Sequence, residues 1–393
     1  MKCLPASKVI QANGTVLHDT HAEIVAIRSF NYFLINECQD LLRSGLRSST
    51  FIRRRDAAEI SDEHFQPFAV KDDTRIHMYS SEAPCGDASM ELVMERQEDA
   101  TPWAVSGPSP RATSSEAENS PEVPSSLHGR GYFSELGIVR RKPSRPDAPP
   151  TNSKSCSDKL SHMTATSLLL SPTALLIHPT NAYLSTLILP SSQHSPLATH
   201  RAFSATGRLS PLSDVQSNWK GGYKFQPFEV RTTSREFEFS RRGGGGGGGG
   251  GSDDAKGAAV ARTRTPSNLS VAYTPRFQET LIGGVLQGRR QFDPRGASRV
   301  CKRGIWRAVA EAVALFQAAG GAILANGGSV AAAGRRLQTA FPSAAAGDTK
   351  PTYEEALKAS PLLAARRAVK DDVRSLALKG WRRNGGNAFV IGE

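Results

Sequence analysis

The stretch Leu17-His18-Asp19-Thr20-His21-Ala22-Glu23 decides the fold, because it places a histidine and a carboxylate at the start of a long predicted helix. The helix is predicted from Thr20 to about Arg43, and either Asp19 or Thr20 can cap its start. Its apolar positions recur at helical spacing and include Ile24, Ile27, Leu34 and Leu41. We therefore expect His21 and Glu23 to be held on the first turn of a buried helix.

Two further stretches supply thiols, Pro84-Cys85-Gly86-Asp87 and Ser155-Cys156-Ser157-Asp158-Lys159. One imidazole and two thiolates form a zinc ligand set, and three protein ligands leave the fourth tetrahedral position open, as in catalytic sites. We expect Cys85 to begin a second helix, where the helix dipole favours the thiolate that zinc requires. His21, Cys85 and Cys156 are therefore the predicted metal ligands.

Glu23 lies two residues after His21 and is the predicted proton carrier. From the first helical turn its carboxylate can take a proton from a metal-activated water and pass it to a leaving amine. Zinc nucleobase deaminases combine a His/Cys/Cys site with such a glutamate in an H-x-E and P-C-x-x-C signature. Here the second cysteine follows the first by 71 residues, so the compact form of that signature is interrupted.

Composition narrows the class of protein. The 393 residues carry 49 Lys+Arg against 37 Asp+Glu, a net charge of +12, which favours a polyanionic partner and nucleic acid first. A hydrophobic content of 38% excludes wholesale disorder. No apolar run reaches the length of a membrane span, and no apolar run follows Met1 as in a signal peptide. The five cysteines, an odd number, indicate reduced thiols and a cytoplasmic or nuclear protein.

Strand and helix patterns alternate along the chain and predict an α/β domain. We expect strands within 75–80, 174–177, 183–189, 225–239, 269–273 and 280–286, and helices over 306–318 and 353–379. Segments rich in Ser, Pro, Gly and Ala, including nine consecutive glycines at 243–251, predict disordered insertions at about 97–127, 241–268 and 320–350. Residues 1–393 are therefore expected to form a single domain.

The three motifs, in this order, resemble the editase domain of adenosine deaminases acting on RNA. Within that family the sequence is most similar to the eukaryotic, fungal-type, tRNA-specific adenosine deaminases. Further similarity lies at 137–147, 183–187, 284–289 and 293–298. The resemblance covers the chain nearly end to end, apart from the expected insertions.

The resemblance implies a cytidine-deaminase-like three-layer α/β/α fold and zinc-dependent hydrolytic deamination of adenosine to inosine in tRNA. The implied substrate is the adenosine at position 37, beside the anticodon of alanine tRNA. His21, Cys85 and Cys156 would hold Zn²⁺, a zinc-bound hydroxide would attack C6, and Glu23 would shuttle the proton. A base in an anticodon loop is already partly single-stranded, so its extrusion costs less than extrusion from a duplex.

The resemblance also implies a buried inositol hexakisphosphate and polar groups that relay hydrogen bonds from it to the metal. The residues that match the family's ligand positions are Asp19, Ile24, Arg28, Lys159, Lys302, Tyr353, Arg366 and Trp381. The sequence departs from the family pattern at two places, Leu362-Leu363 and Arg383-Asn384. We expect contact with the tRNA backbone at Lys2, Arg140, Arg141, Lys142 and Arg145.

Met1 stands where the family has a threonine that contacts the substrate ribose, and a helix and strand precede that position in the family. We therefore expect the chain to be N-terminally truncated relative to the family. Two other functions stay open at this point. One is editing of duplex RNA, although no module typical of duplex binding is visible. The other is an inactive RNA-binding protein that keeps zinc for structure, for which Glu23 would have no use.

Overall fold

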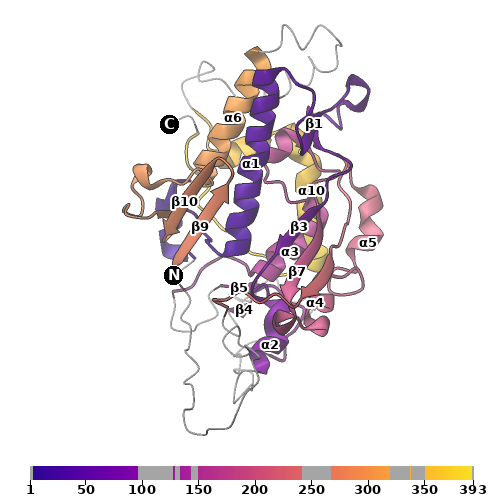
Figure 1. Ribbon diagram of the computed structural model, residues 1–393, viewed down its shortest axis with the longest axis vertical. Coiled ribbons are helices and arrows are strands. Elements are labelled where there is room, and N and C mark those ends of the chain that lie inside the picture. Colours follow the sequence, from indigo (N-terminus) through magenta and orange to yellow (C-terminus); the bar gives the residue numbers. More distant parts are fainter. Residues whose placement is uncertain are drawn as a thin grey trace, which may run out of the picture.

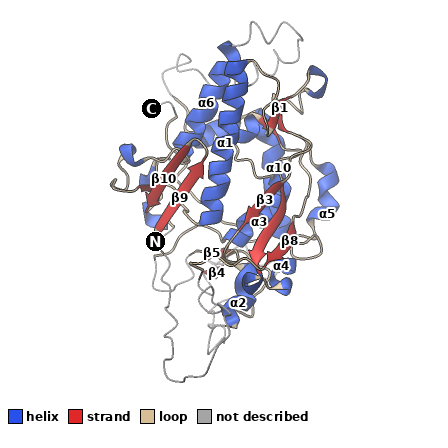
Figure 2. Cartoon of the chain, viewed as in Figure 1, coloured by secondary structure: helices blue, strands red, loops and turns tan. Residues whose placement is uncertain are grey.

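Helix α1 runs through the middle of the computed structural model, with strands on both sides of it and α6 packed along it (Figure 1). The structure describes residues 3–95, 127–128, 133–142, 149–240, 267–318, 337 and 350–391. The helices in these ranges are α1 (Ala22–Ser44), α2 (Met90–Met94), α3 (Cys156–Thr166), α4 (Pro196–Phe203), α5 (Leu212–Val215), α6 (Lys302–Ala318), α9 (Tyr353–Ala359) and α10 (Ala364–Asp372). Figure 2 shows helices lying both between and around the strands.

The strands form small separate sheets. Sheet order is β1-β2-β6, β3-β7-β8 and β11-β10-β9, with a further pair β4-β5. Their bounds are β1 (Ile52–Arg54), β2 (Phe68–Val70), β3 (Ile76–Tyr79), β4 (Leu127–His128), β5 (Arg140–Arg141), β6 (Ile177–His178), β7 (Leu184–Pro190), β8 (Glu229–Thr233), β9 (Leu269–Thr274), β10 (Phe277–Ile282) and β11 (Val285–Leu286). Strands β3, β7 and β8 run parallel, so their carboxyl ends share one edge. The mixture of helices and parallel strands confirms the predicted α/β class.

Helix α1 is close to the predicted helix and ends where Gly45 adopts a left-handed conformation, with φ of 75°. Gly45 donates its backbone N–H to the carbonyl of Leu41, which is the usual way of satisfying an orphan carbonyl at a helix end. The apolar face of α1 is shared between two cores. Leu34, Ile35 and Leu41 pack with β2 and α6, and Ile27 packs with β7. The helix thereby fixes its first turn, which carries His21 and Glu23.

Most predicted elements are confirmed, but the segments 174–177 and 353–379 differ from the prediction. The run 174–177 was expected as a strand, but it begins with a 3-10 helix (Thr173–Leu175) and only its end joins β6. The expected helix 353–379 is divided into α9, a 3-10 turn (Pro361–Leu363), α10 and a π-helical turn (Val373–Ala377). Proline lacks the backbone N–H that an α-helix interior needs, so Pro361 interrupts the pattern.

The predicted insertions fall mainly outside the described residues. Leu337 is an exception, because it is described and lies buried in the core beside α6. The prediction of one domain over the whole chain stays a prediction. No helix in the described ranges is both long enough and apolar enough to cross a membrane.

Candidate metal centre

His21, Cys85 and Cys156 come together although they are far apart in the sequence. One ligand atom from each lies within 4.8 Å of the other two, and His21 Nδ1 is 3.8 Å from Cys85 Sγ. Zinc–sulfur bonds of about 2.3 Å and zinc–nitrogen bonds of about 2.0 Å at a tetrahedral angle place ligand atoms about 3.6–3.8 Å apart. The three side chains therefore fit one zinc ion in spacing and in donor chemistry, and they leave a fourth position open.

The backbone around the two thiols is locked. Gly86 has φ of 104°, and a Cβ there would overlap the side chain of Ser155, so this position needs glycine. Ser157 donates its backbone N–H to the carbonyl of Cys85 at 3.0 Å. Ser155 is the N-cap of α3 and accepts from the backbone of Asp158. These contacts hold the Cys85 loop against the start of α3.

Cys156, and not Cys85, begins a regular helix, which corrects one expectation. Cys85 precedes only a 3-10 turn (Asp87–Ser89) and the short helix α2. The pKa of the Cys85 thiol nevertheless lies well below its usual range, because it accepts a hydrogen bond from Cys156 and faces positive charge, while burial opposes the shift. Burial, and then Cys85, raise the pKa of Cys156.

Glu23 lies in the first turn of α1, two residues beyond His21, and is half-buried. No hydrogen bond or ion pair of its carboxylate occurs within the described residues. Burial and the contact with Cys85 raise the pKa of Cys156, and the negative charge of Glu23 raises it further. Glu23 therefore influences the metal ligands electrostatically. A carboxylate beside the ligands and unoccupied by other described groups is suited to moving protons.

Behind the ligands lies a buried network centred on Asp19. Its carboxylate accepts hydrogen bonds from the His21 backbone at 3.0 Å, from Lys142 Nζ at 2.8 Å and from the ammonium of Lys159. Lys142 Nζ also donates to Cys156 Sγ at 3.2 Å. Burial disfavours the charged forms of Asp19 and Lys142. The positive charges of Lys142 and Lys159 nevertheless hold the pKa of Asp19 well below its usual range. The charge of Asp19 likewise raises the pKa of Lys142.

The structure contradicts three of the expected RNA contacts. Arg140, Arg141 and Lys142 are only 1%, 8% and 4% exposed, so their side chains face the interior and cannot lie along an RNA backbone. The physical reason for Lys142 is its pairing with Asp19 and Cys156. Lys2 and Arg145, the other two residues assigned to RNA contact, lie outside the described residues.

A cavity of about 400 Å³ adjoins this network, and eight of its 18 lining residues are Lys or Arg. Of the residues expected to hold a polyphosphate, Lys159, Arg366 and Trp381 line it. Trp381 stacks on His162 with ring centroids 5.0 Å apart, and Lys154 lies over its ring. Leu363, at a position where the family pattern is broken, also lines the cavity.

The other residues expected to hold the polyphosphate do not line the cavity; they are Asp19, Ile24, Arg28, Lys302 and Tyr353. Lys302 Nζ donates at 2.6 Å to the side chain of Asn387, which lines the cavity. Arg28 donates to the carbonyl of Val300, and Tyr353 stacks on Phe389 with centroids 5.0 Å apart. Ile24 belongs to the first turn of α1 and is not among the lining residues.

Basic side chains outnumber carboxylates around the cavity, where eight Lys and Arg residues face only Glu354 and Asp371. Burial, and then the charge of Arg28, lower the pKa of Lys302 to about 7. Burial, Arg366 and Arg374 lower the pKa of Lys370 well below its usual range. Nε of Arg366 and Nε of Arg374 are buried without a hydrogen-bond partner in the structure. Because buried polar atoms are normally paired, these groups fit an anionic ligand with many oxygen atoms.

Sequence reasoning missed Lys370, Arg367 and Arg374, which line the same cavity. A signal was available, because Arg366, Lys370 and Arg374 recur every four residues and such residues share one face of a helix. Lys154 also lines the cavity. The only sign of this in the sequence is that Lys154 lies two residues before Cys156.

Residues 1–384 match the family model of the adenosine-deaminase (editase) domain. The chain is 38% identical over 242 residues to tRNA-specific adenosine deaminase 1 of Schizosaccharomyces pombe, covering 61% of this chain and 56% of that protein. It is 34% identical over 167 residues to tRNA-specific adenosine deaminase 1 of Saccharomyces cerevisiae, covering 41% of this chain and 37% of that protein. The chain thus spans 56% of the length of the S. pombe relative and 37% of the length of the S. cerevisiae relative.

Proposed function

The chain belongs to the adenosine-deaminase (editase) domain family, and from that premise we propose that it converts adenosine to inosine in tRNA by zinc-dependent hydrolysis. The observation that carries the proposal is the convergence of His21, Cys85 and Cys156 with Glu23 beside them. The names of the S. pombe and S. cerevisiae relatives support tRNA as the substrate.

When bound, zinc would lower the pKa of a water and make it a nucleophile at neutral pH. The chain's own residues do the rest. Glu23 takes a proton from the attacking water and delivers it to the exocyclic amine, which leaves as ammonia. Lys142 places a positive charge 3.2 Å from Cys156 Sγ and so favours the thiolate. Asp19 fixes the backbone of His21, so the imidazole keeps its orientation.

Within this proposal the substrate adenosine is the one beside the anticodon of alanine tRNA, at position 37. A loop nucleotide can reach the open metal position after little unstacking, whereas a duplex nucleotide must first be flipped out. We further propose that the cationic cavity holds inositol hexakisphosphate. The unpaired guanidinium nitrogens of Arg366 and Arg374 and the depressed pKa of Lys302 support a ligand with several phosphates.

The test measures inosine formed in an alanine tRNA anticodon stem-loop by the zinc-loaded chain, beside a long RNA duplex of equal adenosine content. We expect inosine in the stem-loop and little in the duplex. Glu23→Gln keeps the shape of the side chain but cannot accept the proton, so turnover should fall about 10²–10⁴-fold. Zinc content should be unchanged in Glu23→Gln. Full turnover by this variant would rule out the mechanism, and inosine in the duplex alone would identify the duplex-editing function.

A further inference from the structure

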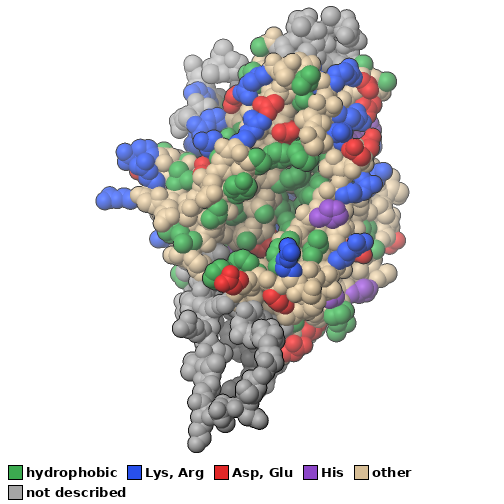
Figure 3. Space-filling view, viewed as in Figure 1, with side chains coloured by type: hydrophobic (Ala, Val, Ile, Leu, Met, Phe, Trp, Pro, Cys, Tyr) green, Lys and Arg blue, Asp and Glu red, His purple; other side chains and the backbone are tan. Residues whose placement is uncertain are grey.

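A loop rich in arginine, residues 287–299, connects the short strand β11 to α6, and we call it the arginine loop. It carries four arginines against one acidic residue, Asp293. All four arginines are exposed, and they are Arg289, Arg290, Arg295 and Arg299. Figure 3 shows Lys and Arg side chains on a projection at the left edge of the molecule, where Figure 1 draws this loop beside β10. The loop therefore presents a basic surface to solvent.

Two of the four arginines are paired and two are not. Arg295 Nη2 lies 2.9 Å from the Asp293 carboxylate, and Arg299 Nε lies 3.4 Å from a glutamate carboxylate on β10. Within the described residues, the guanidinium groups of Arg289 and Arg290 form no hydrogen bond or ion pair. Neighbouring unpaired cations repel each other, and an anionic chain relieves that repulsion.

The backbone of the arginine loop is held in one shape. Gln291 donates its side-chain amide to the carbonyl of Gly283 at 2.6 Å. Phe292 adopts a left-handed conformation with φ of 73°, which is costly for a bulky residue. Its ring packs against a buried apolar cluster that includes Val16 and Val285, and this packing holds the strained residue in place. A loop ordered in advance loses little further freedom when it binds a ligand.

The loop is tied to the segment that enters the metal centre. Leu17 donates its backbone N–H to the carbonyl of Gly284 at 2.9 Å, just before the loop, and Arg303, just after it, donates its backbone N–H to the carbonyl of Gly14 at 3.1 Å. The four-residue step from Leu17 to His21 spans at most about 14 Å. The arginine loop is thereby anchored close to the metal centre.

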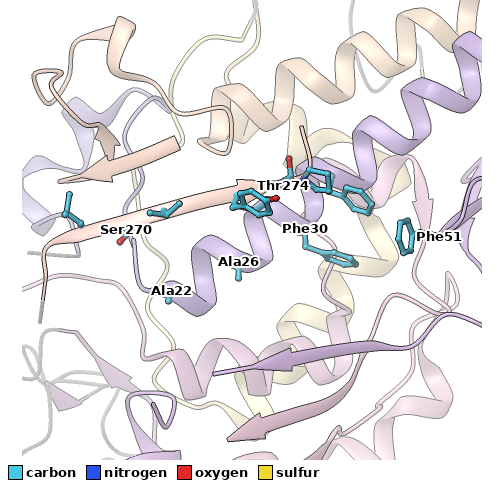
Figure 4. A pocket seen from close by; sticks show the side chains of 12 residues that line it. Ala22, Ala26, Phe30, Phe51, Ser270 and Thr274 are labelled. Atoms are coloured by element: carbon cyan, nitrogen blue, oxygen red, sulfur yellow. The ribbon is translucent and has the colours of Figure 1, made fainter. Parts of the chain in front are cut away.

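Other parts of the described chain suit an RNA backbone less well. The groove between α1 and β9, about 740 Å³ in volume, is lined by apolar side chains such as Phe30 and Phe51 (Figure 4). None of the described residues that line this groove is charged. The basic side chains first expected to contact RNA face the interior, and they are Arg140, Arg141 and Lys142. The exposed positive charge that an RNA backbone requires lies instead on the arginine loop.

We propose that the arginine loop binds the phosphate backbone of the tRNA stem whose loop enters the metal centre, with Arg289 and Arg290 as the phosphate contacts. A guanidinium group donates paired hydrogen bonds to phosphate oxygens. A double-helical RNA stem is recognised through its backbone, because side chains cannot read its deep and narrow major groove. The inference rests on the proposed function, since it takes tRNA as the substrate.

The test is fluorescence anisotropy of labelled alanine tRNA with the zinc-loaded chain at several salt concentrations. Arg289→Gln/Arg290→Gln removes two phosphate contacts, so the slope of log affinity against log salt should become shallower by about two. Arg43→Gln/Arg47→Gln is the matched control and should keep the slope. It removes the same charge from exposed positions at the carboxyl end of α1, about 30 Å along the helix from His21. Arg289→Lys/Arg290→Lys keeps both charges and should keep most of the slope.

Turnover separates this inference from the proposed function. The unchanged chain should form inosine in the tRNA. Arg289→Gln/Arg290→Gln should raise KM but leave kcat and zinc content unchanged, because neither arginine is a metal ligand. A lack of inosine with the unchanged chain would overturn the proposed function, and the binding curves would still decide on the arginine loop. No tRNA binding, an unchanged affinity and slope in the glutamine variant, or an equal loss in the Arg43→Gln/Arg47→Gln control would overturn the inference.

Discussion

The metal centre and the cationic cavity meet at Lys159, and they treat buried charge in opposite ways. At the metal centre Lys142 Nζ lies 2.8 Å from the Asp19 carboxylate, and the pKa of this lysine is raised. In the cavity, burial and neighbouring cations depress the pKa of Lys370, and the same causes depress the pKa of Lys302 beside it. At the metal centre Lys142 and Lys159 face the carboxylate of Asp19, whereas in the cavity eight Lys and Arg residues face only Glu354 and Asp371.

The difference shows which ligand each region requires. Two thiols, one imidazole and the Asp19–Lys142 pair need only a divalent cation to complete them. The cavity gathers Arg366, Lys370 and Arg374 around a space of about 400 Å³, and burying several like charges together is costly. A polyanion removes that cost. We therefore expect removal of the metal to affect chemistry and removal of the polyanion to affect stability.

The largest expected effect comes from removing a metal ligand. Cys156→Ala should abolish stoichiometric zinc binding and inosine formation, because the two remaining ligands cannot complete a tetrahedral site. Metal analysis of the purified variant checks this. Cys38→Ala is the matched control, since Cys38 is equally buried but lies in the core beside α6 and should keep its zinc. Retained zinc in Cys156→Ala would mean that the three side chains are not the metal site.

The next prediction tests whether Lys142 supports the metal site or contacts RNA, as the sequence first suggested. Lys142→Met removes the positive charge beside Cys156 Sγ while Asp19 keeps its contact with Lys159. Loss of a group that supports a metal ligand typically costs about 10–100-fold in metal affinity or activity. Zinc affinity measured by competition with a chelator should fall accordingly, and tRNA affinity should not. A fall in tRNA affinity alone would restore the RNA-contact assignment.

The structure brings His21, Cys85 and Cys156 together as the sequence predicted, because each lies in a short motif whose local structure is fixed by its neighbours. Gly86 and Ser155 are examples, since the glycine conformation and the helix cap can be read from a few residues. The burial of Lys142 could not be read in this way, because its partners Asp19 and Cys156 are distant in the sequence.

A smaller effect tests whether the cationic cavity binds inositol hexakisphosphate. Inositol hexakisphosphate should raise the melting temperature, with a stabilisation of about 2.7 kcal/mol at a concentration one hundred times its Kd. Inorganic phosphate at equal phosphate concentration is the control. Lys302→Met should reduce the gain, whereas Lys8→Met, on the exposed N-terminal 3-10 turn, should not. An equal gain in Lys302→Met would remove this lysine from the site.

Lys302 determines how the free energy of unfolding changes with pH. Its pKa is about 7 in the folded chain, against an ordinary value of 10.5. Between these values the unfolded chain binds more protons, so the ligand-free protein gains stability as pH rises. Lys302 faces Arg28, Glu354 and His18, and burial is the main cause of its shift. A polyanion favours the protonated lysine, so the thermal gain should be larger near about pH 6 than near about pH 9. A gain that grows with pH would contradict this assignment.

The smallest effect tests whether helix α9, which lines the cavity, can be destabilised without loss of zinc from the metal centre. Thr352 caps α9 in a reciprocal pair with Glu355, and Glu354 and Lys358 of α9 line the cavity. Thr352→Ala should lower the free energy of unfolding by about 1 kcal/mol, because an orphan N–H at the helix start loses its acceptor. Chemical denaturation measures this, and Thr352→Ser is the control that keeps the cap. Zinc content should stay the same in both variants, because α9 contributes no metal ligand. A parallel loss of zinc would show that the metal centre and the cavity are coupled.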